Sequence, residues 1–440
     1  MMNWKEEYER KMVSAGEAVE VIRSDDCVAF AYGSEPLDLS MAFIARSPEL
    51  NNIKLFIPAP GRKFPWYQKG WEGIFDVRVG YILPVARDML KERRGDYLVS
   101  SLFWAENPEL KEPVDVLLIQ LSTPDDHGYC SFGASLWDKK RVVRASKVVL
   151  AEVNENLIRT YGDNFIHVSE IDYFVKHTPT GQSPGVKDIM GRKTTGPGEI
   201  EKVIAQYIST LIKDGDTLEV GVGGVAEWIL TLGVLEDKND LGWHSENCPR
   251  GTATLIKKGV ITGKRKTLNP NKAVATACGG GTKEEMGFFN MNPVLELQAS
   301  DYVLDPRVIG AHDNMVAINS ALSVDLTGQI VSESVGPVMI SGTGGQLAFA
   351  IGVTLSKDGR NIIALPSTAR EGTQSRIVSQ LAPGSIVTVP RTLADIFVTE
   401  YGIAKLKGKT QRQRAEELIA IAHPDFRSQL KKEAERLFWP

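Results

Sequence analysis

The sequence has few of the residues that build metal centres and disulfide frameworks, with four cysteines and six histidines in 440 residues. The cysteines lie far apart without C-x-x-C spacing, so we expect free thiols and no metal. No apolar run approaches the roughly 20 residues that cross a bilayer. The charged start of the chain also lacks the apolar core of a signal peptide. These absences predict a cytoplasmic protein that does not span a membrane.

An excess of positive charge is also missing. Lys and Arg number 51 against 55 Asp and Glu, which gives a formal net charge of −4. The overall charge therefore offers no reason to expect nucleic acid or an anionic membrane as a partner. A hydrophobic share of 42% and a charged share of 24% are ordinary for a globular protein. A chain of this length has room for two or three domains.

The sequence does contain a regular alternation of apolar and amphipathic segments. Amphipathic stretches such as residues 199–213 predict helices, and Ser14 with Glu17 predicts a capping box at a helix start. Apolar runs bounded by turn residues predict buried strands between these helices. The alternation predicts an α/β fold with largely parallel or mixed sheets covered by helices. The expected strands are 27–33, 53–58, 114–122, 147–153, 217–224, 272–281, 301–305, 314–322, 361–368 and 385–390.

Residues 178–198 interrupt this alternation. They are rich in Gly, Pro, Ser and Thr and have no apolar period, which predicts a linker between domains. We therefore expect an N-terminal α/β domain over residues 1–185, a linker over 186–200 and a C-terminal α/β domain over 201–440. The end of the chain is helical except at Pro424 and is expected to pack back on the body of the protein.

Three glycine-rich turns follow expected strands, at residues 220–224, 279–282 and 341–346. A turn without side chains lets a ligand approach the backbone, and its N–H groups can bind an anion or a developing oxyanion. The first turn precedes residues 225–233, an expected helix whose N-terminus would add to this effect. The spacing matches neither a dinucleotide-binding fingerprint nor a P-loop. Ordinary tight turns without a ligand remain the alternative for each of them.

Residues 241–249, LGWHSENCP, carry the other polar side chains of interest. A glutamate in a polar loop is usually a solvated carboxylate, so Glu246 alone does not indicate catalysis. His244 is as readily a core histidine, His127 is readily part of a turn, and no G-x-S-x-G elbow supports a serine nucleophile. The residues alone therefore predict a two-part α/β enzyme with a glycine-lined site.

Several long, collinear segments resemble the acetyl-CoA hydrolase/transferase family, and especially its 4-hydroxybutyrate and butyrate:acetate CoA-transferase branch. The resemblance covers nearly the whole chain and is strongest in residues 113–133 and 162–175 of the first half. The second half contributes residues 241–247, 260–268, 305–309, 313–336, 341–349, 362–369, 375–378, 398–410 and 421–427.

The resemblance implies two open α/β domains of the CoA-transferase type with the active site between them, and often a homodimer. In the family motif L-G-x-H-[ST]-E the glutamate is the nucleophile, and Glu246 holds that position. Gly344 and Gly345 correspond to the source of an oxyanion-stabilising amide. The positions that correspond to the coenzyme A site are Val220, Gly221, Val222, Gly223, Gly224, Ala317, Gly342 and Lys357.

The implied activity is the transfer of coenzyme A between an acyl-CoA and a small carboxylic acid through a glutamyl-CoA thioester. Two alternatives stay open: an acyl-CoA hydrolase of the same family and a non-catalytic CoA-binding protein. The residues that follow Glu246 depart from the family pattern, which suggests an unusual acyl group. Trp228, Trp243 and Phe288–Phe289 are candidates to shape a pocket for a bulky acid, with core packing as the alternative.

Overall fold

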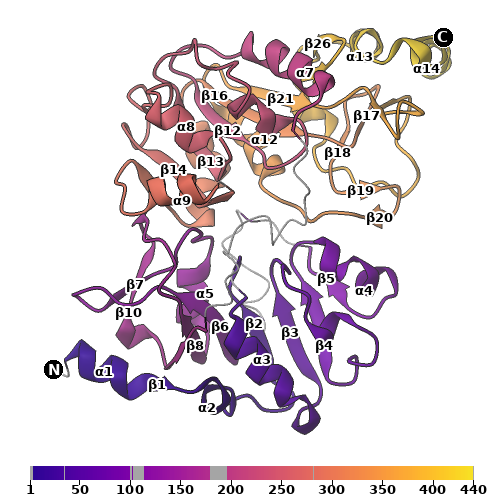
Figure 1. The fold of residues 1–440 in the computed structure, drawn as a ribbon. Coiled ribbons are helices and arrows are strands. Elements are labelled where there is room, and N and C mark those ends of the chain that lie inside the picture. The colour runs from indigo at the N-terminus through magenta and orange to yellow at the C-terminus, as the bar shows by residue number, and fades with distance from the viewer. Residues whose placement is uncertain are drawn as a thin grey trace. The chain divides into compact units, whose positions relative to one another are not determined.

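The computed structural model describes residues 3–33, 35–99, 102, 113–178, 196–280 and 282–439. The chain divides into two compact units, shown in Figure 1. Unit 1 comprises Met1–Lys193 and Thr276–Asp301, and unit 2 comprises Thr194–Ala275 and Tyr302–Pro440. Residues 276–301 thus belong to unit 1, whereas the sequence assigned them to the second domain. Most of the expected linker, residues 186–195, lies outside the described residues.

Unit 1 is built on a sheet of eight strands in which every pairing is parallel. Five of the six residues in its strand β6 are buried, as expected for a central strand. The helices of this unit include α2 (Ala15–Val19), which starts with the expected capping box, and α3 (Leu37–Ala45). The strand order is β1 (Met12–Val13), β11 (Tyr173–Lys176), β8 (Val148–Val153), β6 (Val116–Leu121), β2 (Cys27–Phe30), β3 (Ile53–Ile57), β4 (Phe75–Val79) and β5 (Asp96–Tyr97).

Unit 2 carries strands of a second sheet, in which β25 (Ile396–Thr399) and β26 (Gly402–Lys405) pair antiparallel, whereas the pairings from β25 inward to β13 (Gly242–Pro249) are parallel. Both sheets therefore confirm the predicted α/β class. Helices α7 (Glu199–Ser209) and α12 (Gln346–Leu355) belong to this unit. Six neighbouring strands of its sheet are β26 (Gly402–Lys405), β25 (Ile396–Thr399), β21 (Arg360–Ala364), β16 (Met315–Ser320), β12 (Thr217–Val220) and β13 (Gly242–Pro249).

Three local predictions are wrong. Residues 301–305 lie mostly in helix α10 (Ser300–Val303), because a short apolar run fits a buried helix as well as a strand. Residues 385–390 form no strand and contribute only an isolated bridge between Val389 and Ile330. The first glycine turn is followed only by the short 3₁₀ helix η6 (Ala226–Leu230), where the sequence predicted a helix over residues 225–233.

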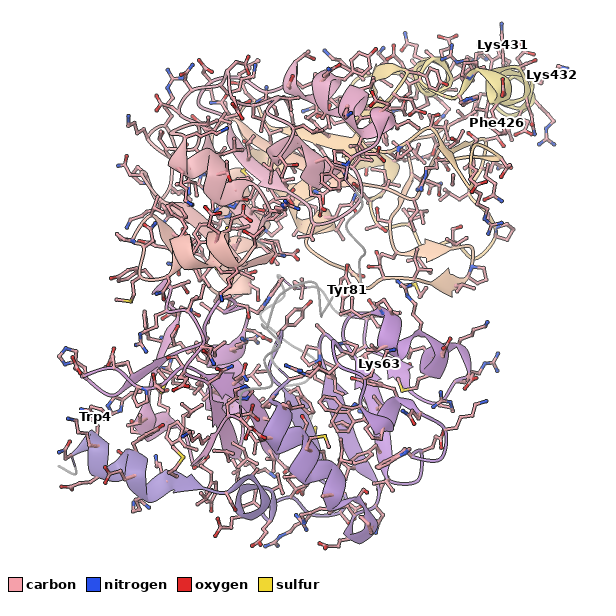
Figure 2. The ribbon with its side chains drawn as sticks, in the orientation of Figure 1. Trp4, Lys63, Tyr81, Phe426, Lys431 and Lys432 are labelled. Carbon is pink, nitrogen blue, oxygen red and sulfur yellow. The ribbon has the colours of Figure 1, made fainter. Side chains whose placement is uncertain are left out.

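The end of the chain packs back on unit 2, as the sequence predicted. Helix α13 (Gln411–Ala420) stops before Pro424, which occupies the first turn of α14 (Pro424–Phe438). Leu430 is buried in the core of the unit and Phe426 packs against that core, whereas Lys431 and Lys432 are exposed (Figure 2). None of the described helices is both long enough and apolar enough to cross a membrane.

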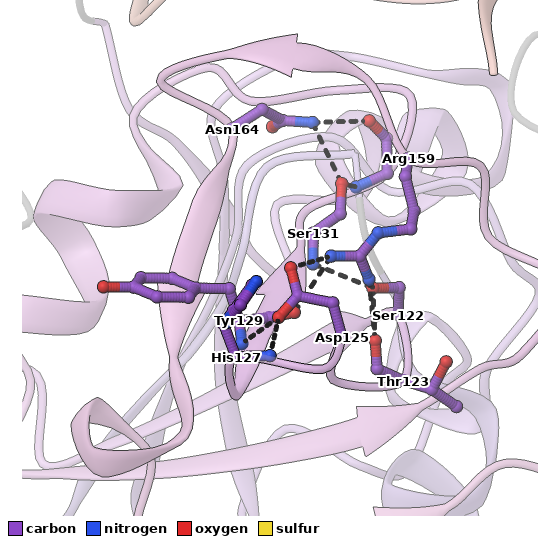
Figure 3. A network of polar contacts seen from close by, with 9 residues as sticks. Ser122, Thr123, Asp125, His127, Tyr129, Ser131, Arg159 and Asn164 are labelled. Carbon is purple, nitrogen blue, oxygen red and sulfur yellow. Dashed lines mark hydrogen bonds and ion pairs between the residues drawn. The ribbon is translucent and has the colours of Figure 1, made fainter. Parts of the chain in front are cut away.

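The loop that contains His127 is held by a polar network in unit 1 (Figure 3). Asp125 accepts the backbone N–H groups of His127 and Tyr129 through one carboxylate oxygen, at 2.9 Å each. Arg159 binds the other carboxylate oxygen at 3.1 Å and also donates to Ser122 Oγ at 2.9 Å. His127 contributes its backbone to this turn while its side chain stays exposed, which agrees with the ordinary structural interpretation.

Candidate active site

Glu246 lies in strand β13 of unit 2, not in the polar loop that its neighbours suggested. Strand β13 pairs in parallel with β12, with Thr217 opposite Gly242 and Leu218 opposite Trp243. Continuing this register places Gly221 beside Glu246. Because alternate residues of a strand share a face, Glu246 lies on the same side of the sheet as Glu219. The sheet therefore fixes the direction of the Glu246 side chain.

A backbone amide from the third glycine turn holds this carboxylate. The N–H of Gly345 donates to Glu246 Oε2 at 2.6 Å, and Gly345 directly precedes α12. On the other oxygen, Asn247 Nδ2 donates to Oε1 at 3.3 Å. A Cβ added to Gly345 would lie 2.5 Å from Glu246 Oε2, so the carboxylate needs a glycine at this position. The structure thus brings Glu246, Gly344 and Gly345 together.

The surroundings of Glu246 favour its neutral form. Burial raises the pKa of this carboxyl to about 7, although the hydrogen bond from the Gly345 amide acts in the opposite direction. A carboxylate that has lost its water shell is a stronger nucleophile than a hydrated one. At neutral pH a substantial fraction of Glu246 is therefore ionised.

The first glycine turn is largely occupied by the protein's own side chains. Gly223 and Gly224 have φ values of +94° and +63°, a conformation that favours glycine. The N–H of Gly223 donates to Glu227 Oε2 at 2.8 Å. A Cβ on Gly221 would lie 2.5 Å from Asn319 Oδ1, so the space beside it belongs to Asn319.

The remaining predicted positions lie in different settings. Val220 is buried in β12, whereas Val222 is 38% exposed in the turn and is open to a ligand. Ala317 is fully buried in β16, opposite Glu219. Gly342 lies in the turn that leads to Gly345. Lys357 is exposed just after the C-terminal end of α12, a helix of ten residues and about 15 Å that begins beside Glu246.

Two domain profiles of one family match the chain: the acetyl-CoA hydrolase/transferase N-terminal domain at residues 97–180 and the corresponding C-terminal domain at residues 281–434. The 4-hydroxybutyrate coenzyme A transferase of Clostridium kluyveri is 43% identical, over 99% of this chain and 100% of that protein. This chain belongs to the acetyl-CoA hydrolase/transferase family.

Two further proteins are similar to this acetyl-CoA hydrolase/transferase family member over nearly the full length. The succinyl-CoA:cyclohexane-1-carboxylate CoA transferase of Geobacter metallireducens is 36% identical, over 99% of this chain and 97% of that protein. The crystal structure of RipA from Yersinia pestis matches with a TM-score of 0.90 and 31% identity, over 100% of both chains. The fold described above is therefore shared across the whole length of a solved structure.

Two of the four aromatic residues considered for an acyl pocket in this family member are core residues. Trp243 is 0% exposed and Phe289 is 1% exposed, so neither ring lines an open surface. Trp243 also points to the opposite face of β13 from Glu246, because the two residues are an odd number of positions apart. For these two residues the structure favours core packing, while Trp228 and Phe288 are only partly buried.

Sequence reasoning missed two buried polar residues on β12 and β16, the strands that follow β13 in the sheet. Glu219 is 2% exposed and Asn319 is 8% exposed, and Asn319 Nδ2 donates to Glu219 Oε2 at 2.7 Å. A signal was present, because Glu219 is a charged residue inside the apolar strand 217–220. Burying a carboxyl is costly unless it is paired or protonated, so such a residue indicates a special environment.

A buried histidine pair lies on the same face as Glu246. The rings of His244 and His312 are 4.6 Å apart, and both residues are 0% exposed. His244 Nε2 donates to the backbone carbonyl of Val303 at 2.9 Å. Among the described residues, neither ring nitrogen of His312 has a hydrogen-bond partner. Burial, assisted by the charge of Lys266, lowers the pKa of His312 to about 3, so this ring is neutral under ordinary conditions.

This pair predicts sensitivity to acid. The folded protein keeps the His312 pKa near 3, whereas the unfolded chain takes up a proton near pH 6.5. Stability from this group is therefore present above about pH 6.5 and falls as the pH drops towards 3, by about 2 kcal/mol at pH 5. We expect His312→Leu to lose less stability between pH 7 and pH 5 than the unsubstituted protein does, as measured by urea unfolding. A His127→Asn control, at an exposed histidine, should not change this difference, and an unchanged slope in His312→Leu would contradict the assignment.

Proposed function

We propose that this enzyme moves coenzyme A from an acyl-CoA to a carboxylic acid through a thioester formed on Glu246. That the chain is an enzyme that transfers CoA follows from its similarity to curated CoA-transferases over nearly its full length. The observation that supports the specific mechanism is the hydrogen bond from the Gly345 amide to Glu246 Oε2. It fixes a partly desolvated carboxylate with one oxygen bound to a backbone donor.

The proposed chemistry uses four acyl transfers. The Glu246 carboxylate attacks the acyl-CoA carbonyl, which forms a mixed anhydride and releases the CoA thiolate. The thiolate attacks the glutamyl carbonyl, which leaves a Glu246–CoA thioester and a free carboxylate. A second carboxylate attacks the thioester, which forms a new mixed anhydride and releases the CoA thiolate. The thiolate then attacks the acyl carbonyl of this anhydride, which gives the new acyl-CoA and restores the Glu246 carboxylate. Thioester and anhydride are of similar reactivity, so the proposed sequence uses no metal and no external energy source.

The position of the Gly345 amide supports the steps that occur at the glutamyl carbon. Attack on that carbon places negative charge on a glutamyl oxygen, and Oε2 already faces the Gly345 N–H. A donor in this position stabilises the tetrahedral oxyanion, and one such donor typically contributes about 3 kcal/mol. Gly344, at the same turn, leaves room for the reacting groups because it has no side chain.

Binding of coenzyme A is proposed for the exposed parts of the glycine turns. The exposed side chain of Val222 and the turn at Gly342 suit contact with the pantetheine arm. Lys357 is exposed and cationic, which suits a phosphate group of the cofactor. A homodimer, which the family resemblance supports, completes this proposal.

Covalent trapping tests the mechanism directly. The protein is incubated with a panel of acyl-CoAs without any acceptor acid, reduced with borohydride and analysed by peptide mass spectrometry. We expect Glu246 to be converted to the alcohol in the peptide that contains it, with near-stoichiometric yield. Steady release of thiol under these conditions, without a trapped intermediate, would instead favour a hydrolase, and an alcohol at another glutamate would contradict the role of Glu246.

A further inference from the structure

A second buried glutamate lies on the face of the sheet that carries Glu246. Glu219 is 2% exposed in β12, the strand between β13 and β16. It is two residues before Gly221, which the strand register places beside Glu246. Gly221 has no side chain, so no Cβ at this position separates Glu219 from the carboxyl end of β12. The negative charge of Glu246 is strong enough at this position to act on Glu219.

The hydrogen-bond partners of Glu219 are neutral. Asn319 Nδ2 donates to Oε2 at 2.7 Å, and the backbone amide of Ile318 also hydrogen-bonds the carboxyl. The side chain of Asn319 occupies the space beside Gly221 that a Cβ at that position would need. Among the described residues, the only charged group that acts on Glu219 is Glu246, and it repels a second negative charge.

Apart from Glu246, the side chains described below on the elements packed around Glu219 are neutral. The Lys266 ammonium, which donates to the Trp243 carbonyl of β13, acts on His244 and His312 and is not among the groups that act on Glu219. Strand β13 contributes His244, whose pKa burial lowers well below its usual value. Strand β16 contributes Asn319 on this face, and His312, which precedes β16, is neutral as described above. Helix α12 covers this face, since it contacts β16 and β21 and Phe349 lies against His244, and it has no titratable residue. Burial and the charge of Glu246 together raise the pKa of Glu219 well above its usual value.

We propose that Glu219 is a positioning residue that stays a neutral acid throughout the reaction, so that the anionic intermediates on Glu246 never face a second negative charge. This rests on the proposed role of Glu246. Each tetrahedral intermediate carries an oxyanion in a site with little water, where a nearby carboxylate would repel it strongly. The neutral carboxyl keeps its hydrogen bond to Asn319 without adding charge, and no proton leaves it during the cycle.

The proposal sets both ends of the pH range of the first half-reaction. On the acidic side of the pH profile, kcat/KM for the acyl-CoA rises as Glu246 of the free enzyme loses its proton, near pH 7. We call this rising part of the profile the acid limb. At high pH it falls when Glu219 finally ionises. Replacing one neutral group by another should leave the acid limb in place, whereas removing a charged group would move it. The acid limb therefore reports the protonation state of Glu219.

The test compares Glu219→Gln and Asn319→Asp with the unsubstituted protein over pH 5.5–10, using the best acyl-CoA of the panel. For Glu219→Gln we expect kcat/KM at pH 7.5 within about threefold, an unchanged acid limb, and higher activity than the unsubstituted protein at the alkaline end. A fall of the acid limb by about one pH unit would show that Glu219 is charged and would overturn the proposal. So would a loss of about 100-fold in a folded variant, because the proton or the charge would then be essential.

Asn319→Asp places an ionisable group against Glu219, and the two carboxyls then share a proton. We expect their added charge to move the acid limb up by about one pH unit. A folded Asn319→Asp protein with an unchanged limb would overturn the coupling to Glu246, and if this variant does not fold, Glu219→Gln decides alone. Glu417→Gln is the matched control, since this half-buried glutamate lies on α13 and binds Lys409, away from Glu246. Borohydride trapping of the same samples separates the two proposals, because a protein that traps no Glu246 intermediate fails the mechanism rather than the role of Glu219.

Discussion

Replacing Glu246 with glutamine is expected to lower kcat for CoA transfer by roughly 10⁴-fold or more, because the amide is not a nucleophile. Glutamine keeps the shape of the side chain, and its oxygen can still accept the hydrogen bond from Gly345. The loss is measured as initial rates with an acyl-CoA and an acceptor acid. Glu417→Gln serves again as the control and should retain the full rate. A Glu246→Gln protein with more than about 1% of the normal rate would contradict the nucleophile, once hydrolysis of the amide back to glutamate is excluded by mass.

The same substitution should stabilise the protein at alkaline pH. The folded state raises the pKa of Glu246 from 4.5 to about 7, so ionisation of Glu246 at alkaline pH destabilises the folded protein. Glutamine does not ionise, so the variant lacks this destabilisation. The favourable contribution of the protonated form is complete below about pH 4.5 and is lost as the pH rises through 7. We expect Glu246→Gln to exceed the original protein by about 1–2 kcal/mol in unfolding free energy at pH 8, after allowance for solvent contact, and by little at pH 5. Urea unfolding at both pH values measures this, and an equal difference at both would show that the pKa is not raised.

The architecture was predictable where long apolar segments decide it. The central strand of residues 114–122 is apolar throughout, and burial on both faces leaves such a segment few alternatives. The capping box at Ser14 and Glu17 needs only residues three apart, so local sequence determines it. By contrast, residues 301–305 form too short an apolar run to distinguish a strand from a helix by sequence. Tertiary contacts determine that most of this run is helical.

The site was less accessible to sequence reasoning because its contacts join distant residues. The polar residues from His244 to Asn247 give no apolar pattern from which a strand could be predicted. The strand forms because β12 provides a pairing partner. The contact between Gly345 and Glu246 spans 99 positions, so no local pattern encodes it. The family resemblance supplied both residues, whereas Glu219 lay outside the family-like segments and Asn319, although inside residues 313–336, was given no role from sequence. The contact between these two side chains came from the structure alone.

The turn that holds Glu246 gives a sharp steric test, because two adjacent glycines differ in the space around them. A Cβ on Gly345 would lie 2.5 Å from Glu246 Oε2 and 2.7 Å from Leu304 Cδ2, whereas a Cβ on Gly344 would lie 3.6 Å from the same carboxylate oxygen. The backbone of Gly345 has φ −79° and ψ −5°, which alanine adopts readily. An effect of Gly345→Ala therefore comes from displacement of the carboxylate or of Leu304 and not from backbone strain, and the pH profile separates the two.

We expect Gly345→Ala to lower kcat/KM by roughly 10²–10³-fold and Gly344→Ala to lower it by about tenfold or less. The acid limb of the Gly345→Ala profile should also move to higher pH, because the amide hydrogen bond lowers the pKa of Glu246 and is lost when the carboxylate shifts. Gly287→Ala is the control, since Gly287 lies in helix α9 (Lys283–Phe289) with nothing within 4 Å of an added Cβ, and alanine there should keep the rate. A Gly345→Ala protein with normal rate and an unmoved limb would mean that this amide does not hold the nucleophile. A lost rate with an unmoved limb would mean that the turn acts elsewhere in the site, so the two readouts together locate the amide relative to the reacting carboxylate.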